Sequence, residues 1–486
     1  MSVSCTETGR RALRLTVLAV MMAAGTLVGS GPGVTCAQEP GPAADAASPP
    51  PGAPEAPTPA VTEMTLAPPV PDAAGVLTPA EGGLGPALWA GSPVELVRRL
   101  LAELPVAAPS PTQRRLTLRL LLSAAAPPAG DDTGNLLAPL RVAKLAALGA
   151  SADLDRLLAQ LPGGRTDPVL ARTLAEAPAA GDPAGLAAVA RSEAADPDQR
   201  VEAAEHAAAA GALSGNDLAT AYASVRFAPA ALARPLSASE QGARGRALVY
   251  QATVGESQPA VQAELVGRWL ALLTPAQTVG PVAELPLAVV ERLPVTATTA
   301  WLAPAAVRGF RAVGRPAAAN PWLLLPPAPA EATALRRLWP LSALAGTGAE
   351  ARGDGGGFDG WLATALAGAD AARRTRVAGV LALLQAAGEP VKEDAWIQAT
   401  DQTTDQSAGA AAAAVPSPAL WQTLTAATAG HRVGEVVLVA LTMLGGGGPQ
   451  TLPPVVLAQV VTSLRAVGLA ADARGLAREA VVALLD

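Results

Sequence analysis

Residues 453–485 read PPVVLAQVVTSLRAVGLAADARGLAREAVVALL, and this stretch decides the fold class. Apolar side chains recur at spacings of three and four over residues 453–466 and again over residues 470–485, which is the period of an α-helix. Gly468 lies between the two segments and marks a turn. The stretch therefore predicts a hairpin of two helices.

Helix-start signals extend the same pattern back to about residue 87. In each signal a Ser, Thr or Asp, which can cap free backbone N–H groups, precedes a proline suited to the first helical position. The signals are Ser92-Pro93, Ser110-Pro111, Asp167-Pro168, Asp182-Pro183, Asp196-Pro197, Thr274-Pro275 and Ser417-Pro418. No run of alternating β-branched residues indicates a strand, so we expect an all-α fold.

The spacing of the signals predicts that short helical hairpins stack on one another. Asp167, Asp182 and Asp196 begin segments about the length of one short helix and a turn. Four other segments open with Arg-Val and close near a glycine, namely 141–149, 200–211, 376–388 and 432–445. Such internal repetition is typical of an α-solenoid, in which each hairpin buries its apolar face against its neighbours.

The last hairpin resembles the tetratricopeptide and HEAT-like helical repeats in its packing of small residues. The resemblance covers about one repeat and lacks the bulky aromatic positions of the tetratricopeptide family. It is carried by Leu464, Gly468, Leu469, Ala473, Leu476, Ala477 and Ala480. It implies an α-solenoid whose usual role is peptide or protein binding. As a whole, the chain is also similar to uncharacterised exported Ala-rich proteins of high-GC bacteria.

The first 37 residues are typical of a secretory signal peptide. Three arginines precede an apolar stretch over residues 15–29 that is short for a membrane span, and small residues suit cleavage after Ala37. Retention as an anchor and lipidation at Cys36 are the alternatives. We therefore expect a periplasmic or secreted protein with no membrane span after signal removal.

The remaining chain divides by composition. Residues 38–86 hold thirteen prolines and no aromatic residue, which predicts a disordered Pro/Ala-rich linker. Residues 87–400 are expected to form the helical-repeat domain and residues 401–416 a flexible loop. Residues 417–486 are expected to form C-terminal helical hairpins that continue the solenoid.

Reactive side chains are scarce in this chain. It holds only two cysteines, Cys5 and Cys36, and only two histidines, His206 and His431. Motifs typical of phosphate binding, serine acylation or a zinc helix are missing. We expect no catalytic residue, no cofactor and no metal. Nucleic acid is a poor partner, because the net charge is −6 and no basic patch stands out.

Two catalytic arrangements remain as an alternative. Glu202 precedes His206 by one helical turn and Glu435 follows His431 by one turn, so either pair can place a carboxylate against an imidazole. The same spacing is that of an ordinary contact on a solvated helix face. A hydrolase on an α/α toroid that uses two carboxylates is the other arrangement, and it predicts a deep pocket in which the two face each other.

Tryptophans supply the candidate partner-binding residues. Trp301, Trp322, Trp339 and Trp361 fall in the middle of the chain, where seven of the eight tryptophans lie. They can line a binding groove, where aromatic anchors often dominate the binding energy. Alternatively, each fills a gap in an Ala-rich core.

Together these features favour a non-catalytic scaffold or adaptor of the bacterial cell envelope that binds a protein or peptide partner. The alternatives are the envelope hydrolase and a passive structural spacer, which would have no saturable partner.

Overall fold

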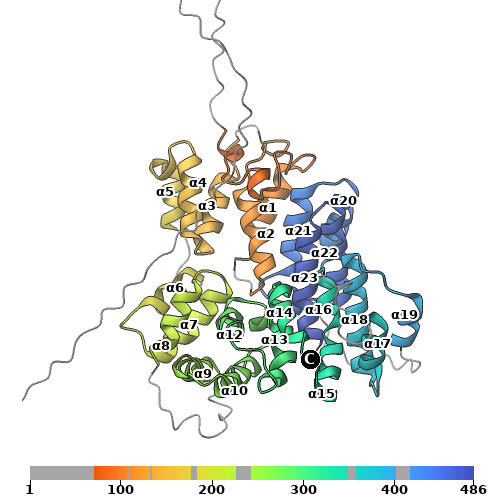
Figure 1. The fold of residues 1–486 in the computed structure, drawn as a ribbon. Coiled ribbons are helices and arrows are strands. Elements are labelled where there is room, and N and C mark those ends of the chain that lie inside the picture. Colours follow the sequence, from red (N-terminus) through yellow and green to blue (C-terminus); the bar gives the residue numbers. More distant parts are fainter. Residues whose placement is uncertain are drawn as a thin grey trace, which may run out of the picture. The chain divides into compact units, whose positions relative to one another are not determined.

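The computed structural model describes residues 70–106, 109–131, 134–176, 183–225, 242–346, 357–400 and 416–485. Within these ranges the chain forms 23 α-helices and several short 3-10 helices (Figure 1). Its only β-type pairings there are two isolated bridges, Leu77 with Ser123 and Pro93 with Ala129. The all-α prediction is thus confirmed for this part of the chain. The predicted signal peptide, residues 38–69 of the predicted linker and residues 401–415 of the predicted loop lie outside it.

The helices of the first half are α1 (Val94–Glu103), α2 (Pro111–Leu122), α3 (Ala138–Ala147), α4 (Ser151–Gln160), α5 (Pro168–Ala175), α6 (Pro183–Arg191), α7 (Pro197–Ala209), α8 (Gly215–Ala223), α9 (Ala243–Gly255), α10 (Pro259–Ala271), α11 (Pro275–Thr278) and α12 (Pro281–Val290). Those of the second half are α13 (Ala303–Ala312), α14 (Pro316–Leu323), α15 (Pro329–Arg337), α16 (Trp339–Leu344), α17 (Gly357–Leu366), α18 (Ala371–Ala387), α19 (Glu393–Ala399), α20 (Pro418–Ala429), α21 (Val433–Leu444), α22 (Pro454–Ala466) and α23 (Ala470–Leu484).

Most of the predicted helix starts are confirmed. Ser110, Asp167, Asp196, Thr274 and Ser417 each cap a helix, with the side-chain oxygen accepting from a backbone N–H of the first turn. α6 also begins at its predicted proline. α1 begins one residue late, because Pro93 itself takes the extended N-cap conformation.

Glycines follow the four helices that contain or begin within the predicted Arg-Val segments. Gly149, Gly211, Gly388 and Gly445 follow α3, α7, α18 and α21, and each has a positive φ. This left-handed conformation ends a helix and is costly for residues with a Cβ atom. The internal repetition in the sequence therefore marks real helix ends.

Residues 70–86, which the composition assigns to the linker, instead pack against the helices. The buried Asp72 carboxylate accepts from the backbone N–H groups of Leu136 and Leu137 at 2.8 Å and of Ala138 at 2.6 Å. The buried Arg141 guanidinium donates to Ala74 O at 2.7 Å and so holds the same segment. We call residues 70–77 the N-terminal arm. The backbone groups that Asp72 holds lie 64 to 66 residues further along the chain, so composition could not reveal them.

The predicted final hairpin is confirmed as α22 and α23, joined at Gly468. α23 contacts more helices than the last helix of a repeat array would contact. It packs against α22 and also against α2, α11, α13, α16 and α18. The described apolar residues form one contiguous core that extends from Leu88 to Val482.

Polar side chains join α2 to α23. Asp472 accepts from Arg115 at 2.8 Å and also from Arg119. Glu479 is buried and accepts from Ser110 Oγ at 2.5 Å and from Thr112 N at 3.0 Å. α21 packs against both α1 and α2. In an open solenoid each repeat contacts only its neighbours, so these contacts between distant segments depart from that simple arrangement.

Candidate functional site

Two adjoining cavities meet at the end of α23. The larger, of about 500 Å³, lies among α10, α12, α13 and α15 and is lined by Leu, Ala, Pro and Gly residues together with Thr278, Arg308 and Arg337. The smaller, of about 170 Å³, is lined by Trp361, Val377, Val380 and three arginines, Arg337, Arg373 and Arg376. Arg337 and Leu485 line both cavities. We call the two cavities together the basic cleft.

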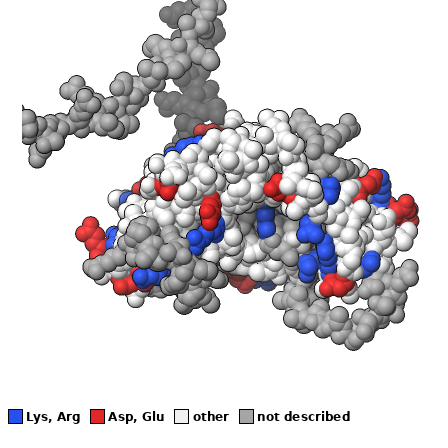
Figure 2. All heavy atoms as spheres, turned by 60° about the horizontal axis from the view of Figure 1, so that its bottom comes forward, with Lys and Arg blue, Asp and Glu red and all other residues white. Residues whose placement is uncertain are grey.

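The arginines of the basic cleft form a local excess of positive charge. Figure 2 shows Lys and Arg side chains gathered beside a hollow on the face that carries α13, α15 and α17. Among the described residues, no carboxylate forms an ion pair with Arg337, Arg373 or Arg376. Arg373 donates only to the Thr364 carbonyl at 3.3 Å. The chain as a whole has a net charge of −6, so this local positive charge is opposite in sign to the charge of the whole chain.

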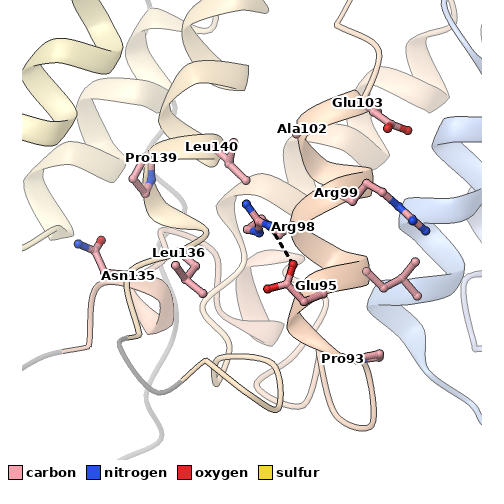
Figure 3. Close-up of a pocket in the computed structure, with 11 residues that line it drawn as sticks. Pro93, Glu95, Arg98, Arg99, Ala102, Glu103, Asn135, Leu136, Pro139 and Leu140 are labelled. Carbon is pink, nitrogen blue, oxygen red and sulfur yellow. Dashed lines mark hydrogen bonds and ion pairs between the residues drawn. The ribbon is translucent and has the colours of Figure 1, made fainter.

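A second hollow, of about 860 Å³, lies between α1 and the residues that lead into α3 (Figure 3). Its apolar wall is built from Leu96 of α1 and from Leu136, Pro139 and Leu140. Charged residues of α1 form its rim, where Arg98 pairs with Glu95 at 2.8 Å. In Figure 3, Arg98 points toward Leu140, while Arg99 points away from that side. We call this hollow the α1–α3 groove.

The N-terminal arm sets the wall of the α1–α3 groove. Asp72 holds the backbone N–H of Leu136, whose side chain stays 37% exposed in the groove. Burial and a hydrogen bond with Asp131 raise the pKa of Asp72 to about 6. Sequence reasoning missed Asp72, because it lies in a Pro-rich segment with no helical period. The one local feature of the sequence that points to Asp72 is that this acidic residue directly follows Pro71.

The four candidate tryptophans occupy different environments. Trp322 and Trp339 are 2% and 8% exposed, which gives them the core-filling position that the sequence left open as the alternative. Trp361 is also buried and stacks on Trp339, with ring centroids 6.0 Å apart, yet it borders the basic cleft. Trp301 is 46% exposed and packs on Gly267, a residue of the larger cavity. The structure therefore does not bring the four into one groove.

The two histidines do not meet the carboxylates that sequence spacing suggested. His206 is exposed, and its Nδ1 lies 2.8 Å from the Glu202 backbone carbonyl, not from the carboxylate. His431 is exposed as well, while Glu435 pairs with Arg432 at 2.7 Å. Neither pair therefore places a carboxylate against an imidazole.

A carboxylate pair suited to glycoside hydrolysis is missing from the cavities described above. The basic cleft has no described carboxylate in its lining. The α1–α3 groove holds Glu95 and Glu103, which stand eight residues apart on α1, or about 12 Å along the helix axis. Paired catalytic carboxylates lie roughly 5–9.5 Å apart. Nor do three or more metal-ligating side chains meet anywhere in the described ranges.

A buried polar cluster between α7 and α9 also escaped sequence reasoning. The Glu205 carboxylate accepts from Tyr222 Oη at 2.6 Å, from Arg246 Nε at 2.8 Å and from Gln277 Nε2 at 3.1 Å. Burial and the Glu205 charge raise the pKa of Tyr222. The cluster lines neither the basic cleft nor the α1–α3 groove, and its hydrogen bonds join α7, α8, α9 and α11.

Comparisons with known proteins add no relative. No family model, no curated protein and no solved structure gives a significant match to this chain. No helix in the described ranges is both long enough and apolar enough to cross a bilayer.

Proposed function

We propose that this chain is a non-catalytic helical scaffold or adaptor of the bacterial cell envelope, and that it binds a protein or peptide partner in the α1–α3 groove. The observation that carries the proposal is the exposed apolar wall of that groove. Leu136, Leu140 and Leu96 face solvent in part there, beside the Glu95–Arg98 pair. An apolar centre with a polar rim is the usual anatomy of a binding interface.

The size of the groove suits an extended or helical segment of a partner. Its volume of about 860 Å³ lies at the upper end of the range for small-molecule pockets, and it is open along one side. Amphipathic peptides bind such grooves through a few apolar anchors. The segment from Asn135 to Leu140 forms one wall, and α1 forms the other.

The scaffold itself is proposed to be a run of stacked hairpins. Successive helices from α6 to α10 contact their neighbours in the chain, as in an α-solenoid. The resemblance of the last hairpin to tetratricopeptide-type packing supports the same interpretation. Outside this run, α21 packs against α1 and α2, and α23 packs against α2, so the groove wall at α1 rests on a braced element. Export to the periplasm or the exterior rests on the signal-like residues 1–37.

The proposal is tested by crosslinked capture from the native cell-envelope fraction, with the tagged full chain as bait. Leu136→Asp places a charge in the apolar wall and should lower capture of one saturable partner about tenfold or more, as for a central interface residue. Ile397→Asp, on the 67% exposed Ile397 of α19, is the matched control and should capture as well as the wild type.

The other outcomes separate the alternatives. Equal capture by wild type and Leu136→Asp would rule out the α1–α3 groove as the binding surface. If the folded bait captures no protein in a saturable way, the passive spacer would be favoured. Substrate turnover by the folded chain would favour the hydrolase.

A further inference from the structure

We propose that the basic cleft binds an amphiphile with an anionic head group and an unbranched apolar chain. The head group would lie on Arg337, Arg373 and Arg376, and the apolar chain would fill the larger cavity. This site is separate from the α1–α3 groove and does not depend on the function proposed there.

The arginines supply the first part of the argument. Three guanidinium groups that line one cavity of about 170 Å³ repel one another, and no described carboxylate forms an ion pair with them. A bound anion would remove that repulsion. Arginine is the residue best suited to carboxylate and phosphate, because its planar N–H groups form paired hydrogen bonds with two oxygens.

The larger cavity supplies the second part. Leu270, Leu273, Pro304, Ala305 and Leu338 form an apolar side of this cavity, while Arg308, Arg337 and Thr278 add polar groups to its lining. Its volume of about 500 Å³ lies within the usual range for small-molecule pockets. Apolar chains gain free energy in proportion to the surface that they remove from water. The apolar side of the cavity thus gives a flexible hydrocarbon chain a surface to pack against.

The junction between the cavities joins the two parts. Arg337 and Leu485 line both cavities, so one molecule can place its anion at the arginines and its chain among the leucines. A small free anion would leave the larger cavity unused, and a neutral hydrocarbon would leave the arginines unpaired. An amphiphilic anion satisfies both.

The test is isothermal titration calorimetry of the full chain with dodecanoate, at concentrations below micelle formation. We expect saturable binding of one dodecanoate. Dodecyltrimethylammonium, which has the same chain and the opposite charge, and acetate, which has the same head group and no chain, should each bind at least about tenfold more weakly. Dodecyl phosphate in a parallel titration distinguishes a carboxylate from a phosphate head group, and tighter binding of either one supports the site.

Variants locate the binding. Arg337→Gln with Arg376→Gln should weaken dodecanoate about tenfold or more, because both side chains lie at the surface and can be changed without opening the core. Arg336→Gln is the matched control, since Arg336 neighbours Arg337 but donates to Thr333 Oγ1 and lines neither cavity. Ala305→Phe, which fills the larger cavity, should weaken dodecanoate and leave acetate unchanged.

Trp301 gives a second readout. It packs on Gly267 of the larger cavity, so its fluorescence should change on dodecanoate binding, and Trp301→Phe should reduce the total change to the part that comes from Trp361 in the smaller cavity. Equal binding of the cationic amphiphile, or equal loss in Arg336→Gln, would overturn the proposal. Binding to phosphatidylglycerol vesicles without binding of monomeric dodecanoate would assign the arginines to a membrane surface and would overturn it too.

Discussion

Asp72 is a single carboxylate whose protonation should govern how firmly the N-terminal arm is held. Its pKa rises from an ordinary value of 3.8 to about 6, because it is buried and hydrogen-bonded to Asp131. Between about pH 4 and pH 6 the folded protein therefore keeps a proton that the unfolded chain has lost. The contribution of this group to stability is complete below pH 4 and is lost as the pH rises to about 6.

Asp72→Asn should remove this pH dependence. Relative to the variant, the wild type should lose up to about 3 kcal/mol in the free energy of unfolding between pH 4 and pH 7, since each pKa unit corresponds to about 1.4 kcal/mol. Urea denaturation of both proteins across this range measures the difference. Asp370→Asn is the control, because Asp370 also caps a helix but at the surface. A wild type and an Asp72→Asn variant with parallel pH profiles would contradict the prediction.

Tryptophan substitutions should separate core residues from surface residues. Trp322→Ala leaves a large cavity in the core and should cost about 3–5 kcal/mol of stability. Trp301→Ala removes a half-exposed ring and should cost about 1 kcal/mol or less, in the range of ordinary surface changes. Thermal denaturation distinguishes the two. Similar losses for both variants would show that Trp301 is as important to packing as Trp322.

At the scale of elements, helix positions could be read from the sequence because their signals are local. Ser110 and Asp167 lie next to the N–H groups that they cap, and Gly388 lies at the helix end that it terminates. The fold of residues 70–86 could not be read in this way. Asp72 stabilises α3 from 65 residues away, and nothing around it in the sequence indicates that partner.

The junction between α2 and α23 should depend on its charged residues. Asp472 is nearly buried between Arg115 and Arg119, so Asp472→Ala leaves two guanidinium groups without their acceptor. Arg115 keeps about half of its side chain exposed, so the loss should be that of hydrogen bonds to a charged group, about 2 kcal/mol. Asp359→Ala, which breaks the exposed pair with Lys392, is the matched control and should cost about 0.5 kcal/mol or less. Equal effects in chemical denaturation would contradict this view of the junction.

For the whole molecule, the contacts between distant segments predict joint rather than stepwise unfolding. In an open solenoid, repeats near an end can open independently of the far end. Here α2 and α23 share one core and one polar junction. Their most protected amides should exchange with the same free energy of opening in native-state hydrogen exchange, and Asp472→Ala should lower both together. Independent exchange of the two helices would contradict this prediction.

The candidate sites could not be predicted from the sequence, because they too depend on contacts between distant segments. Arg337 and Arg376 belong to different helices, and only the fold brings them to one cavity beside Leu485. Leu136 and Leu96 likewise meet across 40 residues. The tryptophans drew attention because they are rare, but rarity does not distinguish a core ring from a surface ring. Periodicity predicts helices, whereas a site depends on which helices meet.

The pairing of α2 with α23 has a consequence for biosynthesis. Asp472 leaves the ribosome 357 residues after Arg115. At translation rates of about 5–20 residues per second, α2 waits roughly 20–70 s for its partner. During that time Ser110 and Arg119 have no acceptor on α23, and the face of α2 that packs on α23 is open to chaperones and to proteases. An interrupted chain that lacks α23 would keep that face exposed and would be marked for degradation.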